Sequence, residues 1–376
     1  MTEQQKDLGF SDEKYLRGLV SVGNLGKLKV FRDKLKAKKP IVYGAIGGSI
    51  TQGASAKPGQ SYGDLLAKCL EQQTPTTFVN AGIGASNSLF GTFRAQKDLL
   101  SHMPDLVTIE YAVNDTNNPR VAMAYESLVR QCVMCPSKPL VITIFTMLRN
   151  GDNVQDVHIP IGDHYGLAIL SYRDAIYPDI TAGDLVWGDV SPDEVHPNDA
   201  GHAFMFEMLR RYMDKTQVDL QDSDVVGEVD VPKTCLDPQV LKYCGGRIID
   251  ASQMKVLSCE GWTQGPHKAG YLGYQSQTPG AELVVEFTGR LAYLGYQKYA
   301  GDFGQIQVTL DDKVLGVFEG HYEKPLIQQW AGGHTVIDEL STEMDDTVHV
   351  VRFKLLSQTH SASHGHMFDI GYLLVN

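Results

Sequence analysis

The chain has 376 residues, more than one hydrophobic core usually serves, so two domains are expected. Its formal net charge of -12 argues against nucleic acid or an anionic membrane as a partner, because neither attracts an acidic protein. The amino-terminal segment MTEQQKDLGFSDEKYLRGL is polar, and no apolar run is long enough to span a membrane. These features predict a soluble, cytoplasmic protein with reduced cysteines.

Apolar runs typical of buried strands alternate with helix-like stretches in the first part of the chain. The expected strands are residues 41–46, 77–79, 106–111, 140–145 and 185–187. The expected helices include residues 62–72, 121–132 and 199–215. Continuous apolar strands that alternate with helices predict an α/β domain, with a parallel sheet covered on both faces.

The character of the sequence changes after residue 215. An acidic stretch with two prolines follows, and then segments in which apolar and polar residues alternate, as Ile306, Val308 and Leu310 do. The sequence therefore predicts an α/β domain over residues 1–220, a linker over 221–237 and an all-β sandwich over 238–376.

Four short motifs in the first part lie where predicted strands end or loops begin. They are GGSIT at 47–51, NAGIG at 80–84, YAVND at 111–115 and DEVH at 193–196. In α/β enzymes, chemistry gathers at the carboxyl ends of parallel strands. We therefore expect these motifs to converge on one site.

The motifs contain the parts of a serine nucleophile. Ser49 alone reads as a turn serine that caps a helix. Beside it, His196 would accept the serine proton, and Asp193, three residues earlier, would bind the imidazole Nδ1 proton. This combination favours catalysis over capping.

Attack by a serine on an ester generates an oxyanion, which requires hydrogen-bond donors arranged in advance. The sequence offers the Ser49 amide, an amide of the turn at 82–85 and the side chain of Asn114. The neighbouring Asp115 is expected to orient this loop.

The order and spacing of the four motifs resemble the blocks of the SGNH (GDSL-like) hydrolase superfamily. The resemblance implies a flavodoxin-like three-layer domain and assigns the named residues to Ser49, Gly84, Asn114 and His196. Gly48 stands where many members have aspartate. An ungapped alignment leaves the oxyanion amide at either Gly84 or Ala85.

The β-rich part resembles carbohydrate-binding modules of the family-35 type. An SGNH domain followed by such a module is similar to acetyl-mannan esterases of gut bacteria, which implies an acetylated oligosaccharide as the partner. Trp262 and Trp330 are either sugar-stacking platforms or core residues of the sandwich.

Other candidate residues favour structural roles. His202 is a possible second base, but its helical position favours packing. Cys132 and Cys135 have redox or zinc spacing without a second pair, which favours structural cysteines. We predict no cofactor and no catalytic metal, and the resemblance leaves a structural calcium open.

The sequence thus predicts a serine esterase that removes acetyl groups from oligosaccharides, most simply mannan-derived ones, through an acetyl-enzyme. Two alternatives remain: a lipid or thioester hydrolase of the same superfamily, and a non-catalytic carbohydrate-binding protein. The sequence leaves open whether the chain forms a homo-oligomer.

Overall fold

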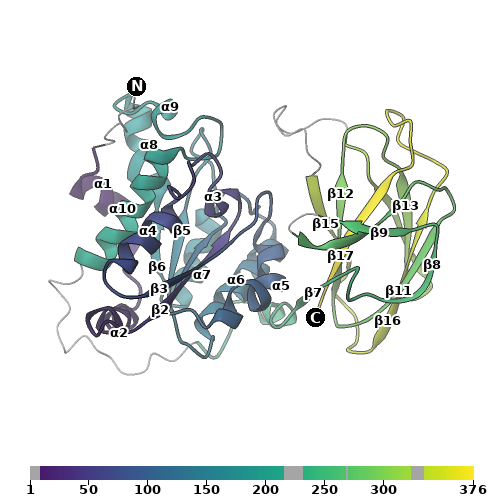
Figure 1. The fold of residues 1–376 in the computed structure, drawn as a ribbon, viewed down its shortest axis with the longest axis horizontal. Coiled ribbons are helices and arrows are strands. Elements are labelled where there is room, and N and C mark those ends of the chain that lie inside the picture. Colours follow the sequence, from purple (N-terminus) through teal and green to yellow (C-terminus); the bar gives the residue numbers. More distant parts are fainter. Residues whose placement is uncertain (1–8, 216–231, 268–269, 323–333) are drawn as a thin grey trace. The chain divides into compact units, whose positions relative to one another are not determined.

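The computed structural model describes residues 9–215, 232–267, 270–322 and 334–376, and it divides into two compact units. The units are Met1–Cys244 and Gly245–Asn376, each with its own fold (Figure 1). Most of the expected linker, residues 221–231, lies outside the described residues. Residues 232–244 pack on the first unit, where the Leu236 amide donates to Glu126 Oε1 and Arg130 donates to the Pro232 carbonyl.

The first unit is built on a mostly parallel sheet with the strand order β1-β6-β5-β4-β2-β3. The strands are β1 (Leu19–Ser21), β2 (Ile41–Gly47), β3 (Thr76–Gly82), β4 (Leu106–Glu110), β5 (Leu140–Phe145) and β6 (Ala168–Ser171). Only β1 pairs antiparallel, at the edge beside β6. The five parallel strands follow the flavodoxin order, as the resemblance implied.

Helices cover both faces of this sheet. They are α1 (Asp12–Gly18), α2 (Leu25–Lys36), α3 (Ser49–Gln52), α4 (Tyr62–Glu71), α5 (Ser88–Asp98), α6 (Pro119–Val133), α7 (Gln155–His164), α8 (Tyr172–Ala182), α9 (Trp187–Val190) and α10 (Asp199–Lys215). Two short 3-10 helices are η1 (Leu100–His102) and η3 (Pro238–Lys242). One core lies between the sheet and α1, α2, α4, α8 and α10, and the other between the sheet and α5, α6 and α7. The three-layer α/β architecture is therefore confirmed.

One strand prediction is wrong. Residues 185–187 form no strand, because Trp187 begins α9 and its indole Nε1 donates to the Asp193 carbonyl. The fifth parallel strand is instead β6, a four-residue segment whose residues are all buried. Both segments are short and apolar, and tertiary pairing rather than local pattern separates them.

The second unit is a sandwich of two antiparallel sheets. Its strands are β7 (Arg247–Asp250), β8 (Lys255–Glu260), β9 (Thr263–Pro266), β10 (Leu272–Ser276), β11 (Glu282–Thr288), β12 (Ala292–Lys298), β13 (Gln305–Leu310), β14 (Lys313–Glu319), β15 (His334–Ser341), β16 (Val348–Leu355) and β17 (Phe368–Val375). One sheet has the order β15-β12-β17-β10-β9, with β7 also on β17, and the other β14-β13-β16-β11-β8. Ile306, Val308 and Leu310 point into the core between the sheets, as their alternation predicts.

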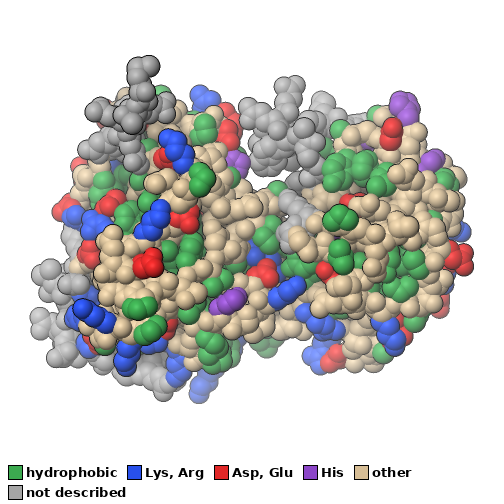
Figure 2. Space-filling model, viewed as in Figure 1, with side chains coloured by type: hydrophobic (Ala, Val, Ile, Leu, Met, Phe, Trp, Pro, Cys, Tyr) green, Lys and Arg blue, Asp and Glu red, His purple; other side chains and the backbone are tan. Residues whose placement is uncertain are grey.

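The described surface fits the acidic composition. On the face shown in Figure 2, the blue Lys and Arg side chains are interspersed with red Asp and Glu, without one continuous basic patch among the described residues. Within the described ranges, every helix is too short or too polar to cross a membrane.

Candidate active site

The nucleophile motif forms a tight turn where β2 ends. Gly47 is the last residue of the strand, Gly48 caps the short helix α3, and Ser49 is its first residue. A β-carbon on Gly47 would collide with the Thr51 side chain and the Glu110 carbonyl, so only glycine fits there. The Gly48 amide donates to the same carbonyl at 3.3 Å, which ties the turn to the end of β4.

Ser49 and His196 meet although they lie 147 positions apart in the sequence. His196 Nε2 is 2.9 Å from Ser49 Oγ, and His196 Nδ1 is 2.7 Å from Asp193 Oδ2. The three side chains form one continuous hydrogen-bonded chain. This is the order of contacts that lets a carboxylate fix an imidazole and the imidazole deprotonate a serine.

The Asp193 carboxylate is held by more than His196. Its Oδ1 accepts hydrogen bonds from the amides of Val195 and His196, both at 2.7 Å. Partial burial by itself raises the Asp193 pKa, but these bonds and the imidazole outweigh it, so the pKa lies below its ordinary value. The Ser191 hydroxyl lies 2.9 Å from the Asp193 carbonyl and 2.7 Å from that of His196, which fixes the loop.

The turn after β3 supplies the amides considered for the oxyanion. Gly84 lies beside the nucleophile, since a β-carbon on it would be 3.7 Å from Ser49 Cβ. Its amide already donates to Gln52 Oε1 at 3.0 Å. The next residue, Ala85, has a φ of 52°, a left-handed conformation that favours glycine, and its amide has no partner within the described residues. Of the two amides, Ala85 is the one available to a ligand.

Asn114 belongs to a turn that follows β4. Its amide and that of Asp115 both donate to the Tyr111 carbonyl, at 3.0 and 2.9 Å. The side chain is half-buried beside Gly48, and its Oδ1 accepts no hydrogen bond from the described residues. Asn114 therefore stands next to the nucleophile turn, and the part of its side chain that can donate to an oxyanion is Nδ2, because Oδ1 only accepts.

A buried arginine that the sequence reasoning missed hydrogen-bonds to the nucleophile turn. Arg94 of α5 is 1 % exposed, and its Nη2 donates to the Gly47 carbonyl at 3.3 Å and to the Tyr111 hydroxyl at 3.0 Å. Asp98, one turn along the same helix, pairs with its Nη1 at 3.2 Å. The sequence gives no signal for this role, because an arginine inside a helical pattern usually indicates a solvent-exposed side chain.

A second missed group is Glu110, the last residue of β4. It is fully buried, and Thr146 Oγ1 donates to its Oε1 at 2.6 Å, whereas Oε2 has no partner within the described residues. Burial raises the pKa of Glu110 to about 7, against the Thr146 bond, and the nearby Asp115 raises it further. The pKa of this carboxyl group therefore lies well above its usual range.

His202 has the packing role that its helical position predicts. Its Nδ1 accepts the Tyr62 amide at 3.3 Å, and its ring stacks on the Tyr62 ring. Burial lowers the His202 pKa to about 4, against a hydrogen bond with the Ala54 carbonyl. Both ring nitrogens of His202 are engaged, so its imidazole has no free lone pair with which to act as a second base for Ser49.

The structure describes Trp262 of the second unit but not Trp330. Trp262 is 5 % exposed and belongs to the sandwich core, so the expectation of a sugar-stacking platform is wrong for this residue. A buried indole presents no face to a ligand. Trp330 lies outside the described residues. Within the described parts of both units, no group of three or more His, Cys, Asp or Glu side chains could hold a metal ion.

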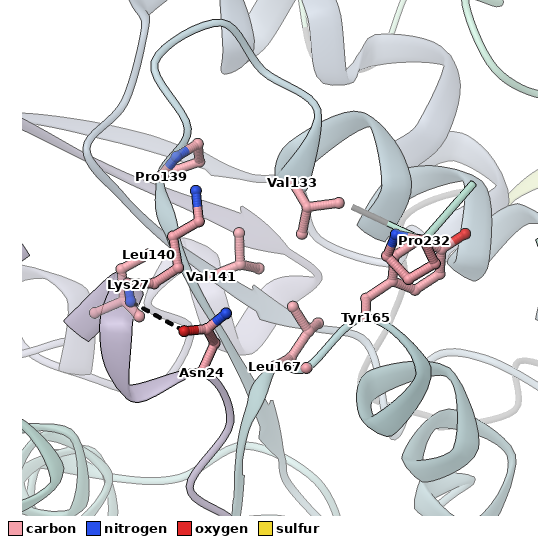
Figure 3. A pocket seen from close by; sticks show the side chains of 10 residues that line it. Asn24, Lys27, Val133, Pro139, Leu140, Val141, Tyr165, Leu167 and Pro232 are labelled. Atoms are coloured by element: carbon pink, nitrogen blue, oxygen red, sulfur yellow. Dashed lines mark hydrogen bonds between the residues drawn. The ribbon is translucent and has the colours of Figure 1, made fainter. Parts of the chain in front are cut away.

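A cavity of about 30 Å³ lies elsewhere in the first unit (Figure 3). Its lining includes Asn24, Lys27, Leu140, Tyr165 and Pro232. It sits where β5 begins, whereas Ser49 follows the end of a parallel strand. It has room for about one or two water molecules. A sugar does not fit there, and the hydrogen-bonded chain at Ser49 remains the candidate site.

Comparisons with known proteins agree with this geometry. The model of the GDSL-like Lipase/Acylhydrolase family matches residues 45–204. A crystal structure of a two-domain esterase active on acetylated mannans is 28% identical, with a TM-score of 0.84, and the match covers 96% of this chain and 98% of that one. A second such structure, co-crystallised with mannopentaose, is 27% identical, with a TM-score of 0.81 and coverage of 96% and 97%. No curated protein matches the chain significantly.

The match over residues 45–204 includes Ser49, Asn114 and His196, and the two similar structures extend over both units. Residues 45–204 of the first domain therefore match the GDSL-like Lipase/Acylhydrolase family, in line with the SGNH superfamily that the order of the four motifs indicates.

Proposed function

We propose that this protein is a serine esterase that removes acetyl groups from acetylated oligosaccharides, with mannan-derived oligosaccharides as the substrate class. The observation that carries the proposal is the continuous chain from Ser49 Oγ through the His196 imidazole to Asp193, with distances of 2.9 and 2.7 Å. A capping or packing role for Ser49 requires no such chain.

In the first half-reaction, Ser49 Oγ attacks the acetyl carbonyl carbon while His196 Nε2 accepts the serine proton. Asp193 stabilises the imidazolium that forms. The oxyanion is bound by the Ser49 and Ala85 amides and by the side chain of Asn114. When the tetrahedral intermediate collapses, His196 gives the proton to the departing sugar oxygen, and the acetyl group stays on Ser49.

In the second half-reaction, water attacks the acetyl-enzyme. His196 takes a proton from the water and returns it to Ser49 Oγ as acetate leaves. The residues that stabilised the first oxyanion stabilise the second. No cofactor is required for either step.

Two similarities support the choice of substrate. The two solved structures that match nearly the whole chain are described as an esterase active on acetylated mannans, and one of them was co-crystallised with mannopentaose. The match includes the β-sandwich as well as the first domain. We therefore assign sugar binding to the second unit, as a carbohydrate-binding module beside the esterase domain.

A panel of substrates tests this proposal against the alternatives. Acetate release is measured on acetylated mannan and acetylated xylan oligosaccharides, and hydrolysis on an octanoyl ester and an acyl thioester. We expect the highest kcat/KM on the mannan oligosaccharides. Faster turnover of the octanoyl ester or the thioester would contradict the substrate class, and glycan binding without turnover would favour a non-catalytic binding protein.

A further inference from the structure

A second pair of an acid and a histidine, Asp115 and His158, lies buried behind the candidate oxyanion site. The Asp115 side chain is 0% exposed and the His158 side chain 1%, and His158 Nε2 lies 3.1 Å from Asp115 Oδ2. Neither residue belongs to the chain through Ser49. Two buried polar side chains without a catalytic contact require another reason to be there.

The second oxygen of Asp115 indicates that reason. Asp115 Oδ1 accepts the amide of Ser88 at 2.8 Å, and Ser88 is the first residue of α5. A carboxylate at a helix amino terminus is stabilised by the helix dipole as well as by the hydrogen bond. Ser88 lies three residues after Ala85, while Asp115 directly follows Asn114. One carboxylate thus joins the two loops that carry the oxyanion donors outside Ser49.

His158 fixes the other side of this carboxylate. Its ring stacks on Tyr125 of α6, with centroids 3.6 Å apart and an interplanar angle of 4°. Its own helix, α7, is tied to the Asn114 loop, because the Val154 amide donates to the Ala112 carbonyl at 2.9 Å. The imidazole therefore has little freedom to move, and it holds Asp115 against the rigid helical layer.

We propose that Asp115 and His158 are positioning residues that set the separation of Ala85 and Asn114, and thereby the geometry of the oxyanion site. This inference rests on the proposed function. Displacement of reacting groups by about 1 Å costs about a hundredfold in rate. The hydrogen bonds of the pair lead to Ser88 and to one another, so the contribution we assign to it is the placement of the two loops.

The test measures kcat and KM on p-nitrophenyl acetate, together with the free energy of unfolding in urea. Asp115→Ala is expected to lower kcat about a hundredfold, with KM within about threefold of wild type. Asp115→Asn keeps an oxygen for the Ser88 amide and is expected to recover about tenfold of that loss. The pH midpoint of kcat/KM is expected to stay at the wild-type value, because the hydrogen-bonded chain at His196 is intact.

Two variants of His158 test the other half of the pair. His158→Gln places an N–H near the former Nε2 and is expected to keep most of kcat, whereas His158→Ala loses it as Asp115→Ala does. Glu126→Gln is the control for a buried carboxylate: Glu126 is 2 % exposed and accepts hydrogen bonds from Tyr165 and the Leu236 amide, away from Ser49. It is expected to lose stability and keep kcat.

Failure of the proposed function and failure of this inference would give different results. A wild type without Ser49-dependent hydrolysis of the acetyl ester would overturn the proposed function and this inference with it. With an active wild type, an Asp115→Ala variant that keeps kcat would overturn the inference alone. So would a loss of kcat in Glu126→Gln as large as that in Asp115→Ala, because the effect would then follow stability rather than position.

Discussion

Asn114 Oδ1 occupies the position that a side chain on Gly48 would take: a β-carbon built on Gly48 would overlap this oxygen. Gly48 has a φ of -85°, so its backbone does not itself require glycine. The missing side chain is what leaves room for the asparagine beside the nucleophile turn.

This relationship predicts the effect of Gly48→Ala. The methyl group would displace the Asn114 side chain, and loss of one oxyanion donor costs about a hundredfold in kcat. In an Asn114→Ala background the same change is expected to cost little more, since the displaced group is already absent. Steady-state kinetics on an acetyl ester measure both effects. Gly188→Ala is the control, because a β-carbon there meets nothing within 4 Å; equal kcat for Gly48→Ala and wild type would contradict the prediction.

The hydrogen-bonded chain predicts strong non-additivity. His196→Ala is expected to lower kcat by about 10⁴-fold or more while the protein stays folded, and Asp193→Asn by about 10⁴-fold. The double variant is expected to be no slower than His196→Ala, because Asp193 acts through the imidazole. Single-variant and double-variant kcat values, with circular dichroism as the check on folding, measure this. Losses that multiply in the double variant would show that the two residues act separately.

Glu110 predicts lower stability at alkaline pH. The pKa of its carboxyl group is about 7 in the folded protein against an ordinary 4.5, so between these values the folded state binds the proton more tightly. Stability from this group therefore falls as pH rises from 4.5 to 7. A change of this size corresponds to about 3 kcal/mol. The free energy of unfolding in urea is measured for wild type and Glu110→Gln at pH 5 and pH 8. The difference, variant minus wild type, is expected to be larger at pH 8. An equal difference at both pH values would argue against a buried ionising carboxyl group.

His202 predicts the opposite slope in acid. Its pKa is about 4 in the folded protein against an ordinary 6.5, so the unfolded chain binds the proton more tightly between these values. Its contribution is fully present above pH 6.5 and is lost as pH falls toward 4. His202→Asn keeps an oxygen to accept the Tyr62 amide and removes the titration. Urea unfolding between pH 6.5 and 4 is expected to show a shallower loss of stability in the variant, and an unchanged slope would contradict the assignment.

Much of the architecture was predictable because local pattern decides it. The buried strands β2, β4 and β5 are continuous apolar runs, and β13 alternates because one face meets the core. The segment at 185–187 was mistaken for a strand because a short apolar run carries no sign of whether it pairs. Strand β6 was missed for the same reason.

The site was predictable where function depends on short spacing. Asp193 and His196 are three residues apart, so their contact follows from one loop. The contact between Gly84 and Gln52, which leaves the Ala85 amide available, depends on how two turns pack, and no sequence pattern encodes it. Arg94, Asp115 and His158 likewise act across 17 to 47 positions of sequence through contacts that only the folded chain creates.

Acetate release from acetylated mannan oligosaccharides by wild type and by Ser49→Ala tests the central claim most directly. Ser49 Oγ is the atom that hydrogen-bonds to His196 Nε2, and the substitution removes that atom and keeps the β-carbon. The account predicts rapid release by the wild type and loss of release in Ser49→Ala, with both proteins folded. Release that continues in the variant at the wild-type rate would show that Ser49 is not the nucleophile.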